Sequence, residues 1–245
     1  MARVDKGDES AGVILAEQEL VRRDASLIER LSPAERDRVR QYGTRRVVQR
    51  GEIVFDQGQR HNGIAIIESG LVRSFYTSPT GRQLTLAYWF PGNFVGGPEI
   101  FGGGVHMWAA VAAQKSTVTL LPGERLRDLA REVPDLALGI IDALVFKARC
   151  YSSLAQMLGT RSLSERLMQV LVHLTNTYGV REKDGIVIAA SYTHAEIANM
   201  IGSTRQWVTV SLNRLQKAKI LTQKRGVLIV LKSDQLGSID PLLED

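Results

Sequence analysis

Residues 193–214, THAEIANMIGSTRQWVTVSLNR, contain the clearest helix start and stop signals in the chain. A threonine followed three residues later by a glutamate has the spacing of a capping box, which predicts a helix that begins just after Thr193. Gly202 is expected to end that helix, because glycine adopts the left-handed conformation that a tight turn requires. Ser203 has a glutamine three residues later, so a second capping box and a second helix are predicted there.

The second helix of this pair has a polar face at its beginning, where side chains of a helix-turn-helix reach base edges in the major groove. Arg205 matches the acceptors of guanine, and Gln206 matches the edge of adenine. The runs 220–222 and 227–230 flank a basic turn, which predicts a hairpin like the wing of a winged helix. The residues expected to contact double-stranded DNA are Thr193, Thr204, Arg205, Gln206, Thr209, Asn213, Lys224 and Arg225.

Positive charge is concentrated in the same part of the chain. Residues 162–232 contain ten Lys or Arg and four Asp or Glu, so this segment carries an excess of six, against a net charge of +5 for all 245 residues. A basic segment attracts phosphate groups, which favours nucleic acid as a partner. A lysine-rich face that is merely solvated would have the same composition, so charge alone does not separate the two interpretations.

The preceding part of the chain has a different pattern of hydrophobic and turn-forming residues. Between residues 44 and 121, short β-branched or aromatic runs alternate with glycine and proline turns, which predicts an all-β barrel of the jelly-roll type. The fold class is therefore α+β: a β-barrel, a long helix and a winged helix-turn-helix. The predicted divisions are a loose arm at 1–20, the barrel at 21–132, the long helix at 133–160 and the winged helix-turn-helix at 161–240.

The long helix is expected to start at Pro134 and to end near Gly159. Apolar residues recur along it with the a and d spacing of a two-stranded coiled coil. Lys147 interrupts this seam, and the alternative is a helix packed on its own domain. The residues expected at a homodimer interface are Ile140, Leu144, Tyr151, Leu154 and Leu158.

Composition excludes several other classes of protein. No run of apolar residues is long enough to span a membrane, and the acidic first thirty residues do not suit a signal peptide, so a cytoplasmic protein is expected. The single cysteine, Cys150, excludes an internal disulfide. A cupin-like metalloenzyme is the alternative from another class, but the barrel offers only His61 and His106 as histidine ligands. No enzyme activity and no metal site are expected.

The order of barrel, long helix and winged helix-turn-helix resembles the CRP/FNR superfamily of bacterial transcription regulators. The supporting motifs are RGEIVFDQG at 50–58, GRQLTL at 81–86, PGNFVG at 91–96 and EIANMIG at 196–202, with Arg205 after the last. The resemblance covers nearly the whole chain. It implies a homodimer on a palindromic DNA site, a barrel that senses an effector, and RNA polymerase as a further candidate partner.

The chain departs from the members of this superfamily that bind cyclic AMP. Those members have a glutamate and an Arg-Ser pair where this chain has Gly97, Met107 and Trp108. A methionine and a tryptophan supply neither a cation nor good donors for a cyclic phosphate, so cyclic AMP is not expected. The iron–sulfur members carry several cysteines near the N-terminus, and this chain has none there. A haem-based regulator stays an alternative, through His61, His106 or Met107.

What remains is a pocket with mostly apolar walls, which suits a small aromatic or hydrophobic effector. The alternative is that these aromatic side chains fill the barrel and that no effector exists. In the recognition helix, the superfamily's usual arginine, glutamate and second arginine correspond to Arg205, Gln206 and Val210, which predicts an altered half-site. The residues expected to line the pocket are Tyr88, Gly97, Met107, Trp108, Tyr151 and Ser152.

Overall fold

The computed structural model describes residues 26–28, 30–224 and 226–236 of the chain. The predicted arm at 1–20 and the wing residue Arg225 lie outside the described residues. The described residues form two compact units: the N-terminal unit ends at Tyr151, and the C-terminal unit begins at Ser152.

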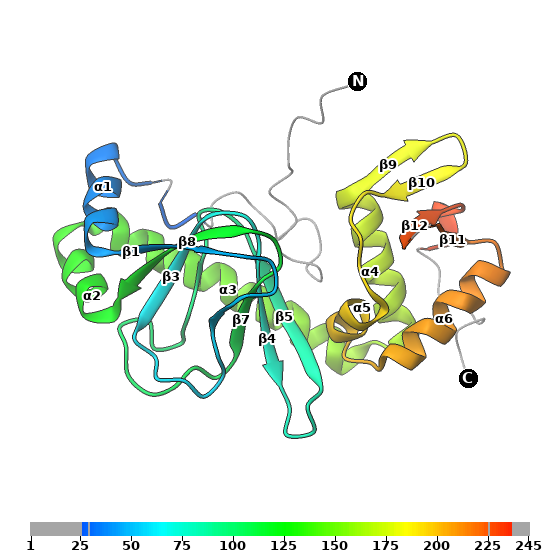
Figure 1. The fold of residues 1–245 in the computed structure, drawn as a ribbon, viewed down its shortest axis with the longest axis horizontal. Coiled ribbons are helices and arrows are strands. Elements are labelled where there is room, and N and C mark those ends of the chain that lie inside the picture. Colours follow the sequence, from blue (N-terminus) through cyan, green and yellow to red (C-terminus); the bar gives the residue numbers. More distant parts are fainter. Residues whose placement is uncertain (1–25, 29, 225, 237–245) are drawn as a thin grey trace. The chain divides into compact units, whose positions relative to one another are not determined.

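The N-terminal unit is a jelly-roll of two four-stranded sheets, in which every paired strand is antiparallel (Figure 1). This confirms the predicted β-barrel. One sheet has the order β1 (Thr44–Val48), β8 (Ser116–Pro122), β3 (Gly63–Ser69) and β6 (Phe94–Val95). The other has the order β2 (Ile53–Phe55), β7 (Ala109–Ala112), β4 (Val72–Thr77) and β5 (Gln83–Trp89).

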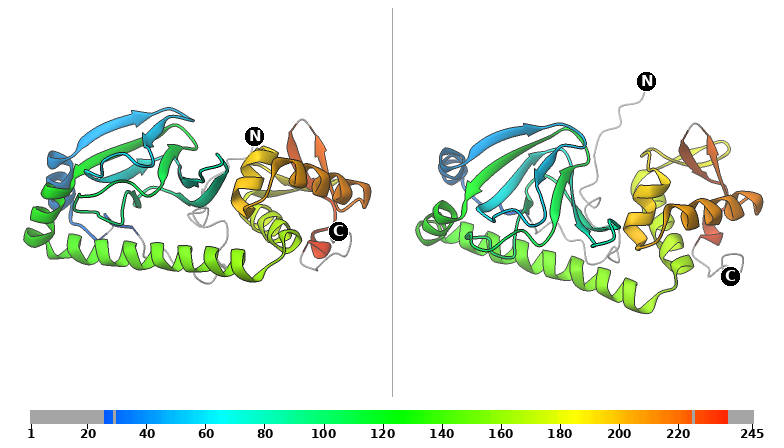
Figure 2. Two further views of the ribbon diagram at one scale, coloured as in Figure 1. Left: turned by 90° about the horizontal axis from the view of Figure 1, so that it is seen from below. Right: turned by 60° about the horizontal axis from the view of Figure 1, so that its bottom comes forward.

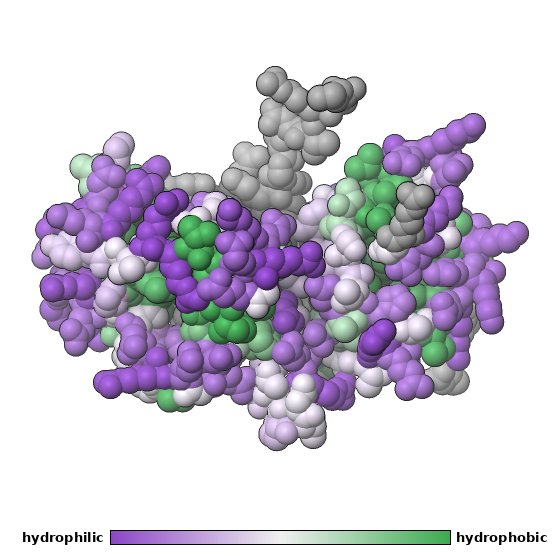
Figure 3. Space-filling model, viewed as in Figure 1, coloured by the Kyte–Doolittle hydropathy of each residue, from purple (hydrophilic) through white to green (hydrophobic). Residues whose placement is uncertain are grey.

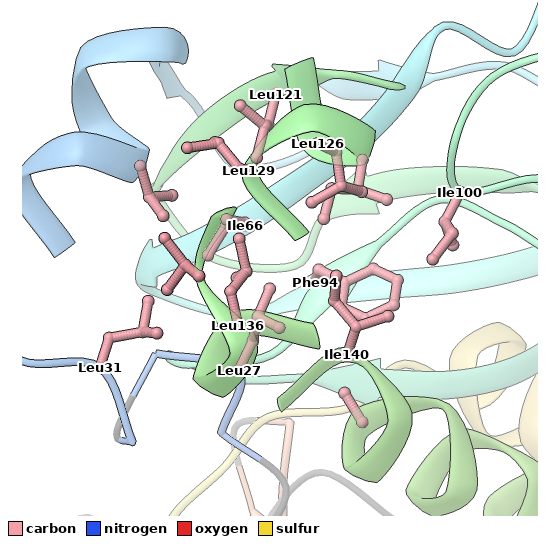
Figure 4. Close-up of a cluster of buried hydrophobic side chains, with 14 residues drawn as sticks. Leu27, Leu31, Ile66, Phe94, Ile100, Leu121, Leu126, Leu129, Leu136 and Ile140 are labelled. Atoms are coloured by element: carbon pink, nitrogen blue, oxygen red, sulfur yellow. The ribbon is translucent and has the colours of Figure 1, made fainter. Parts of the chain in front are cut away.

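Three helices flank this jelly-roll: α1 (Pro33–Tyr42), α2 (Gly123–Glu132) and the first part of α3 (Pro134–Thr160), which runs along the roll (Figure 2). They pack on the first sheet through one apolar cluster (Figure 4). In it Phe94 from β6 lies beside Ile140 from α3. Burial of such side chains, at roughly 1.5–3 kcal/mol each, holds the long helix against the barrel.

The C-terminal unit combines helices with a small sheet. Its helices are α4 (Leu163–Tyr178), α5 (His194–Ile201) and α6 (Arg205–Lys217), with the short 3-10 helix η4 (Ser233–Gln235) after them. Its sheet has the order β11 (Leu221–Lys224), β12 (Val227–Val230), β10 (Gly185–Ile188) and β9 (Gly179–Glu182). The predicted wing is confirmed as β11 and β12. The β9–β10 hairpin, which extends the wing sheet, was not predicted.

The surface drawn in Figure 3 is mostly hydrophilic, with small hydrophobic patches. Within the described ranges, none of the helices combines the length and the apolar character needed to cross a bilayer.

Candidate functional site

The first helix of the predicted helix-turn-helix, α5, begins and ends as its sequence predicts. The Thr193 hydroxyl accepts a hydrogen bond from the backbone N–H of Glu196 at 3.1 Å, and the Thr193 N–H donates to the Glu196 carboxylate at 2.7 Å. Gly202 ends the helix in the left-handed conformation, with φ of +68°. Thr193, a predicted DNA contact, is therefore exposed but has its hydroxyl engaged in the cap.

The start of the recognition helix α6 differs from the prediction by one residue. Thr204 is the N-cap, and its hydroxyl accepts a hydrogen bond from the backbone N–H of Trp207 at 3.2 Å. Ser203, the predicted cap, is buried, and its hydroxyl oxygen has no hydrogen-bond partner in the described part of the chain. The predicted second capping box is therefore wrong, because the serine side chain is turned into the interior.

One face of α6 is largely exposed. Arg205, Gln206 and Asn213 are exposed along it, while the opposite face of the helix is fully buried. Val210 lies on the exposed face with 44% of its surface accessible. The predicted readers of base edges are thus brought together on one side of a helix whose N-terminus also favours phosphate.

Thr209 lies on the same face, half-buried. Its hydroxyl is 2.9 Å from the backbone oxygen of Arg205 and 2.8 Å from Nδ1 of His194, which lies on α5. The hydroxyl of Thr209 is thus held by both helices of the motif. The wing residue Lys224 is exposed at the end of β11, where a cation can reach a phosphate.

A single arginine joins the ends of α3 and α5 in the C-terminal unit. The Arg166 guanidinium, on α4, donates to the backbone oxygens of Leu158 at 2.6 Å, Arg161 at 2.9 Å and Ile201 at 3.2 Å. Leu158 belongs to the last turns of α3, and Ile201 is the last residue of α5. Carbonyls at helix ends lack partners within their own helix, so this arginine satisfies three acceptors at once.

The predicted dimer seam on α3 is out of phase with the exposed face of the helix. Ile140 and Leu154 are buried, Tyr151 and Leu158 are half-buried, and Leu144 alone of the five is exposed. The assignment of Ile140 and Leu154 to an intermolecular seam is therefore wrong, because they are already buried inside the chain. The exposed apolar side chains lie one residue further along: Leu138 (49% accessible), Ile141 (55%), Val145 (45%) and the smaller Ala148.

The structure brings only part of the predicted effector pocket together. The rings of Trp108 and Tyr151 lie 5.7 Å apart, and Tyr151 also meets Trp89, edge to face, at 6.2 Å. Trp89 was not among the predicted residues, whereas its neighbour Tyr88 was. Because adjacent residues of a strand point to opposite faces, the buried Tyr88 lies on the other side of β5.

The other predicted pocket residues do not join these aromatic rings. Met107 is 57% accessible and Ser152 is exposed, so neither lines an enclosed space. Gly97 is buried, and its backbone N–H donates to Nε2 of His61 at 2.7 Å. Of the predicted pocket residues, only Trp108 and Tyr151 are thus shown in contact. Together with Trp89 and Phe146 they form a group of four rings, which we call the aromatic cluster.

Lys147 of α3 lies at this cluster with its ammonium group buried. Its Nζ donates to the backbone oxygen of Phe94 at 2.7 Å and lies 3.4 Å from the centre of the Trp89 ring. None of the ion pairs in the described residues includes Lys147, and its burial lowers its pKa to about 7. The contact with an aromatic face and one carbonyl partly offsets the cost of desolvating this group.

Two histidines that are far apart in sequence are in contact inside the jelly-roll. The ring centres of His61 and His106 lie 4.2 Å apart, and Phe55 stacks on the other face of His106 at 3.9 Å. Burial, and secondarily the neighbouring His61, lower the pKa of His106 to about 4. Among the residues that the structure describes, no group of three or more His, Cys, Asp or Glu side chains is arranged to hold a metal ion.

Two protein-family models match parts of the chain. A model of the cyclic nucleotide-binding domain matches residues 45–133, and a model of the Crp-like helix-turn-helix domain matches residues 165–239. The regulatory protein HlyX of Actinobacillus pleuropneumoniae is 26% identical over 91% of this chain and 86% of its own length. The fumarate and nitrate reduction regulatory protein of Escherichia coli K12 is 24% identical over 78% of this chain and 76% of its own.

Solved structures share the fold. The c-di-GMP responsive global regulator CLP of Xanthomonas campestris superposes with a TM-score of 0.74 at 18% identity, over 81% of this chain and 99% of that one. A CRP-family transcriptional regulator of Thermus thermophilus superposes with a TM-score of 0.61 at 24% identity, over 78% and 94% of the two chains. These likenesses concern the architecture of jelly-roll, long helix and helix-turn-helix.

Proposed function

The chain belongs to the CRP/FNR superfamily of DNA-binding transcription regulators, and on this premise we propose that it binds a palindromic site as a homodimer without needing cyclic AMP. The observation that carries the DNA-binding part is the exposed face of α6. Arg205 and Gln206 there are accessible at the start of a helix that is otherwise packed on α5. A basic wing beside that helix supplies a contact to the phosphate backbone.

The exposed row on α3 supports the homodimer. Leu138, Ile141, Val145 and Ala148 follow one another at spacings of three, four and three residues, which is the repeat of a coiled-coil seam. A second copy of the same helix presents the same row, so the two seams complement each other around a two-fold axis. Two recognition helices would then meet half-sites about 34 Å apart on one face of the duplex.

Sequence and packing both argue against a cyclic nucleotide in the jelly-roll. The cyclic phosphate of such a ligand needs a cation and hydroxyl donors. Here Met107 is largely exposed, and Trp108 packs on Tyr151. The contacts within the aromatic cluster favour a barrel filled by its own side chains over one shaped for an aromatic effector.

The haem alternative is not supported by the geometry of its candidate ligands. Nε2 of His61 already accepts the N–H of Gly97, and the His106 ring lies between Phe55 and His61. The side chain of Met107 is exposed on the surface and does not lie with the two buried histidines. A porphyrin would have to separate the two histidine rings, which are in contact, so these residues do not fit the group.

Selection of binding sites from random duplexes with the full chain, followed by native mass spectrometry, tests this proposal. The expected results are enrichment of a palindrome and a complex of two chains on one duplex, free of any small ligand. Titration with cyclic AMP and with cyclic di-GMP is expected to leave the affinity unchanged. If no sequence were enriched, the DNA-binding part of the proposal would be refuted. One chain per palindrome would refute the dimer. A co-purified small molecule would refute a barrel filled by its own side chains. A contact with RNA polymerase stays a prediction.

A further inference from the structure

The recognition helix carries Val210 where the superfamily's pattern places an arginine, and a second methyl-bearing side chain, Thr209, directly before it. We infer that Thr209, flanked by Val210, reads thymine in each half-site through the thymine 5-methyl group, and not through a hydrogen bond from its hydroxyl. This inference rests on the proposed function, because it assumes that α6 enters the major groove. It names the base class that this part of the helix selects.

The hydroxyl hydrogen of Thr209 is already used inside the protein. Two acceptors compete for it: the backbone oxygen of Arg205 at 2.9 Å and, in one tautomer, Nδ1 of His194 at 2.8 Å. A hydroxyl has a single hydrogen, so in either case none is left to donate to guanine or to thymine O4. If the helix carbonyl takes the hydrogen, Nδ1–H of His194 also uses one of the oxygen's two lone pairs.

With donation excluded, the methyl is the group of Thr209 that can distinguish thymine, because the lone pair left on the hydroxyl oxygen finds no donor on the major-groove edge of thymine. Val210 follows on the exposed face of α6, with 44% of its surface accessible and no polar atom in its side chain. An apolar contact to the thymine methyl is the way in which a methyl group distinguishes bases in the major groove. Both side chains therefore favour thymine next to the bases read by Arg205 and Gln206.

The experiment replaces single thymines of the selected palindrome by deoxyuridine, which differs from thymidine only in the missing 5-methyl group. For the wild-type chain, symmetric replacement of one thymine in both half-sites is expected to weaken binding by about fourfold per half-site, the effect of burying one methyl group. Thr209→Ser keeps the hydroxyl and loses the methyl, so its preference for thymine over deoxyuridine is expected to fall, and only the part due to Val210 should remain. Thr209→Val keeps a methyl and loses the hydroxyl, so it is expected to retain the preference for thymine.

Three results would overturn the inference while leaving the proposed function intact. The first is that the wild-type chain binds each deoxyuridine duplex as tightly as the matching thymine duplex. The second is that Thr209→Ser keeps the full preference for thymine over deoxyuridine. The third is that the enriched site has no thymine in its half-site. Failure to enrich any sequence would instead remove the proposed function and this inference with it. Because the key change is made in the DNA, the wild-type measurement does not depend on the folding of a variant.

Discussion

The helices α6 and α3 carry opposite patterns on their exposed and buried faces. On α6 the apolar residues Val208, Leu212 and Leu215 are buried, and arginine, glutamine and asparagine point outward. On α3 a lysine is buried, and leucine, isoleucine and valine point outward. A polar outer face is stable in water alone, whereas an apolar row at coiled-coil spacing is stabilised by a second helix. Under the proposed function, this contrast places nucleic acid on α6 and another copy of the chain on α3.

The largest effect is expected from breaking the apolar row of α3. Ile141→Glu places a carboxylate from each copy in the proposed seam, and we expect the dimer dissociation constant to rise roughly 1000-fold or more, since two buried isoleucines are lost and two charges are desolvated. Sedimentation equilibrium of the full chain measures this. Gln114→Glu is the matched control, because it adds the same charge on an exposed loop residue. An unchanged dimer in Ile141→Glu would show that this row is not the interface.

The next effect concerns the polar face of α6. Arg205→Ala is expected to weaken binding to the selected site by roughly 5- to 150-fold, because a bidentate contact to guanine contributes about 1–3 kcal/mol. Lys224→Ala serves as the comparison: it should weaken selected and random DNA alike and reduce the salt dependence by about one charge. Fluorescence anisotropy on both duplexes distinguishes them, and equal losses for Arg205→Ala would exclude it from base reading.

The third effect is on stability and is expected from the buried lysine of α3. Lys147→Met is expected to stabilise the chain by about 1–4 kcal/mol, as other replacements of buried charges by apolar residues do. The pKa of Lys147 is lowered to about 7, so between pH 7 and about 10 the unfolded chain binds a proton that the folded chain lacks. The contribution of Lys147 to stability therefore rises with pH in this window and is constant below it.

Denaturant unfolding of the full chain at pH 6.5 and pH 9 checks both parts of this prediction. The methionine variant should lose the pH-dependent rise, while Lys115→Met, at an exposed position of the same unit, should keep it. Loss of stability in Lys147→Met would show that the contacts with Phe94 and Trp89 outweigh the desolvation of the ammonium group.

The smallest effect is expected at the cap of α5. Thr193→Ala removes the acceptor for the Glu196 N–H and should cost about 1 kcal/mol of stability in the C-terminal unit. Thr193→Ser keeps the hydroxyl and should restore most of it. If Thr193 also contacted DNA through this hydroxyl, the alanine variant would lose affinity beyond what its stability explains, which would contradict its role as a cap alone.

The helix-turn-helix could be predicted because its signals are local. A capping pair, a glycine and a basic hairpin each act within a few residues, and the structure reproduces them except for the shift from Ser203 to Thr204. The jelly-roll could be predicted as a class, but no local signal marks β7 as a strand. Its sequence is AAVA, and alanine has little preference for strands, so only its pairing with β2 and β4 identifies it.

The N-terminal unit and α3 could not be predicted in the same detail, because their contacts depend on the helical phase of α3 and on residues that are distant in sequence. Along α3 two adjacent rows are both apolar, and the periodicity fits either; packing on the barrel decides which is buried. Whether Tyr88 or Trp89 faces α3 depends on the register of β5 against β4. The contact of His61 with His106 joins two loops that no local signal connects.

The three carbonyls held by Arg166 have a mechanical consequence. The last turns of α3 and the end of α5 share one guanidinium, and Ile201 immediately precedes the glycine turn that leads into α6. The end of α3 therefore cannot slide past α5 unless charge-assisted hydrogen bonds break. Any rotation imposed on that end of α3 would therefore be transmitted as torque to the turn before the recognition helix, and would not be lost in a flexible linker.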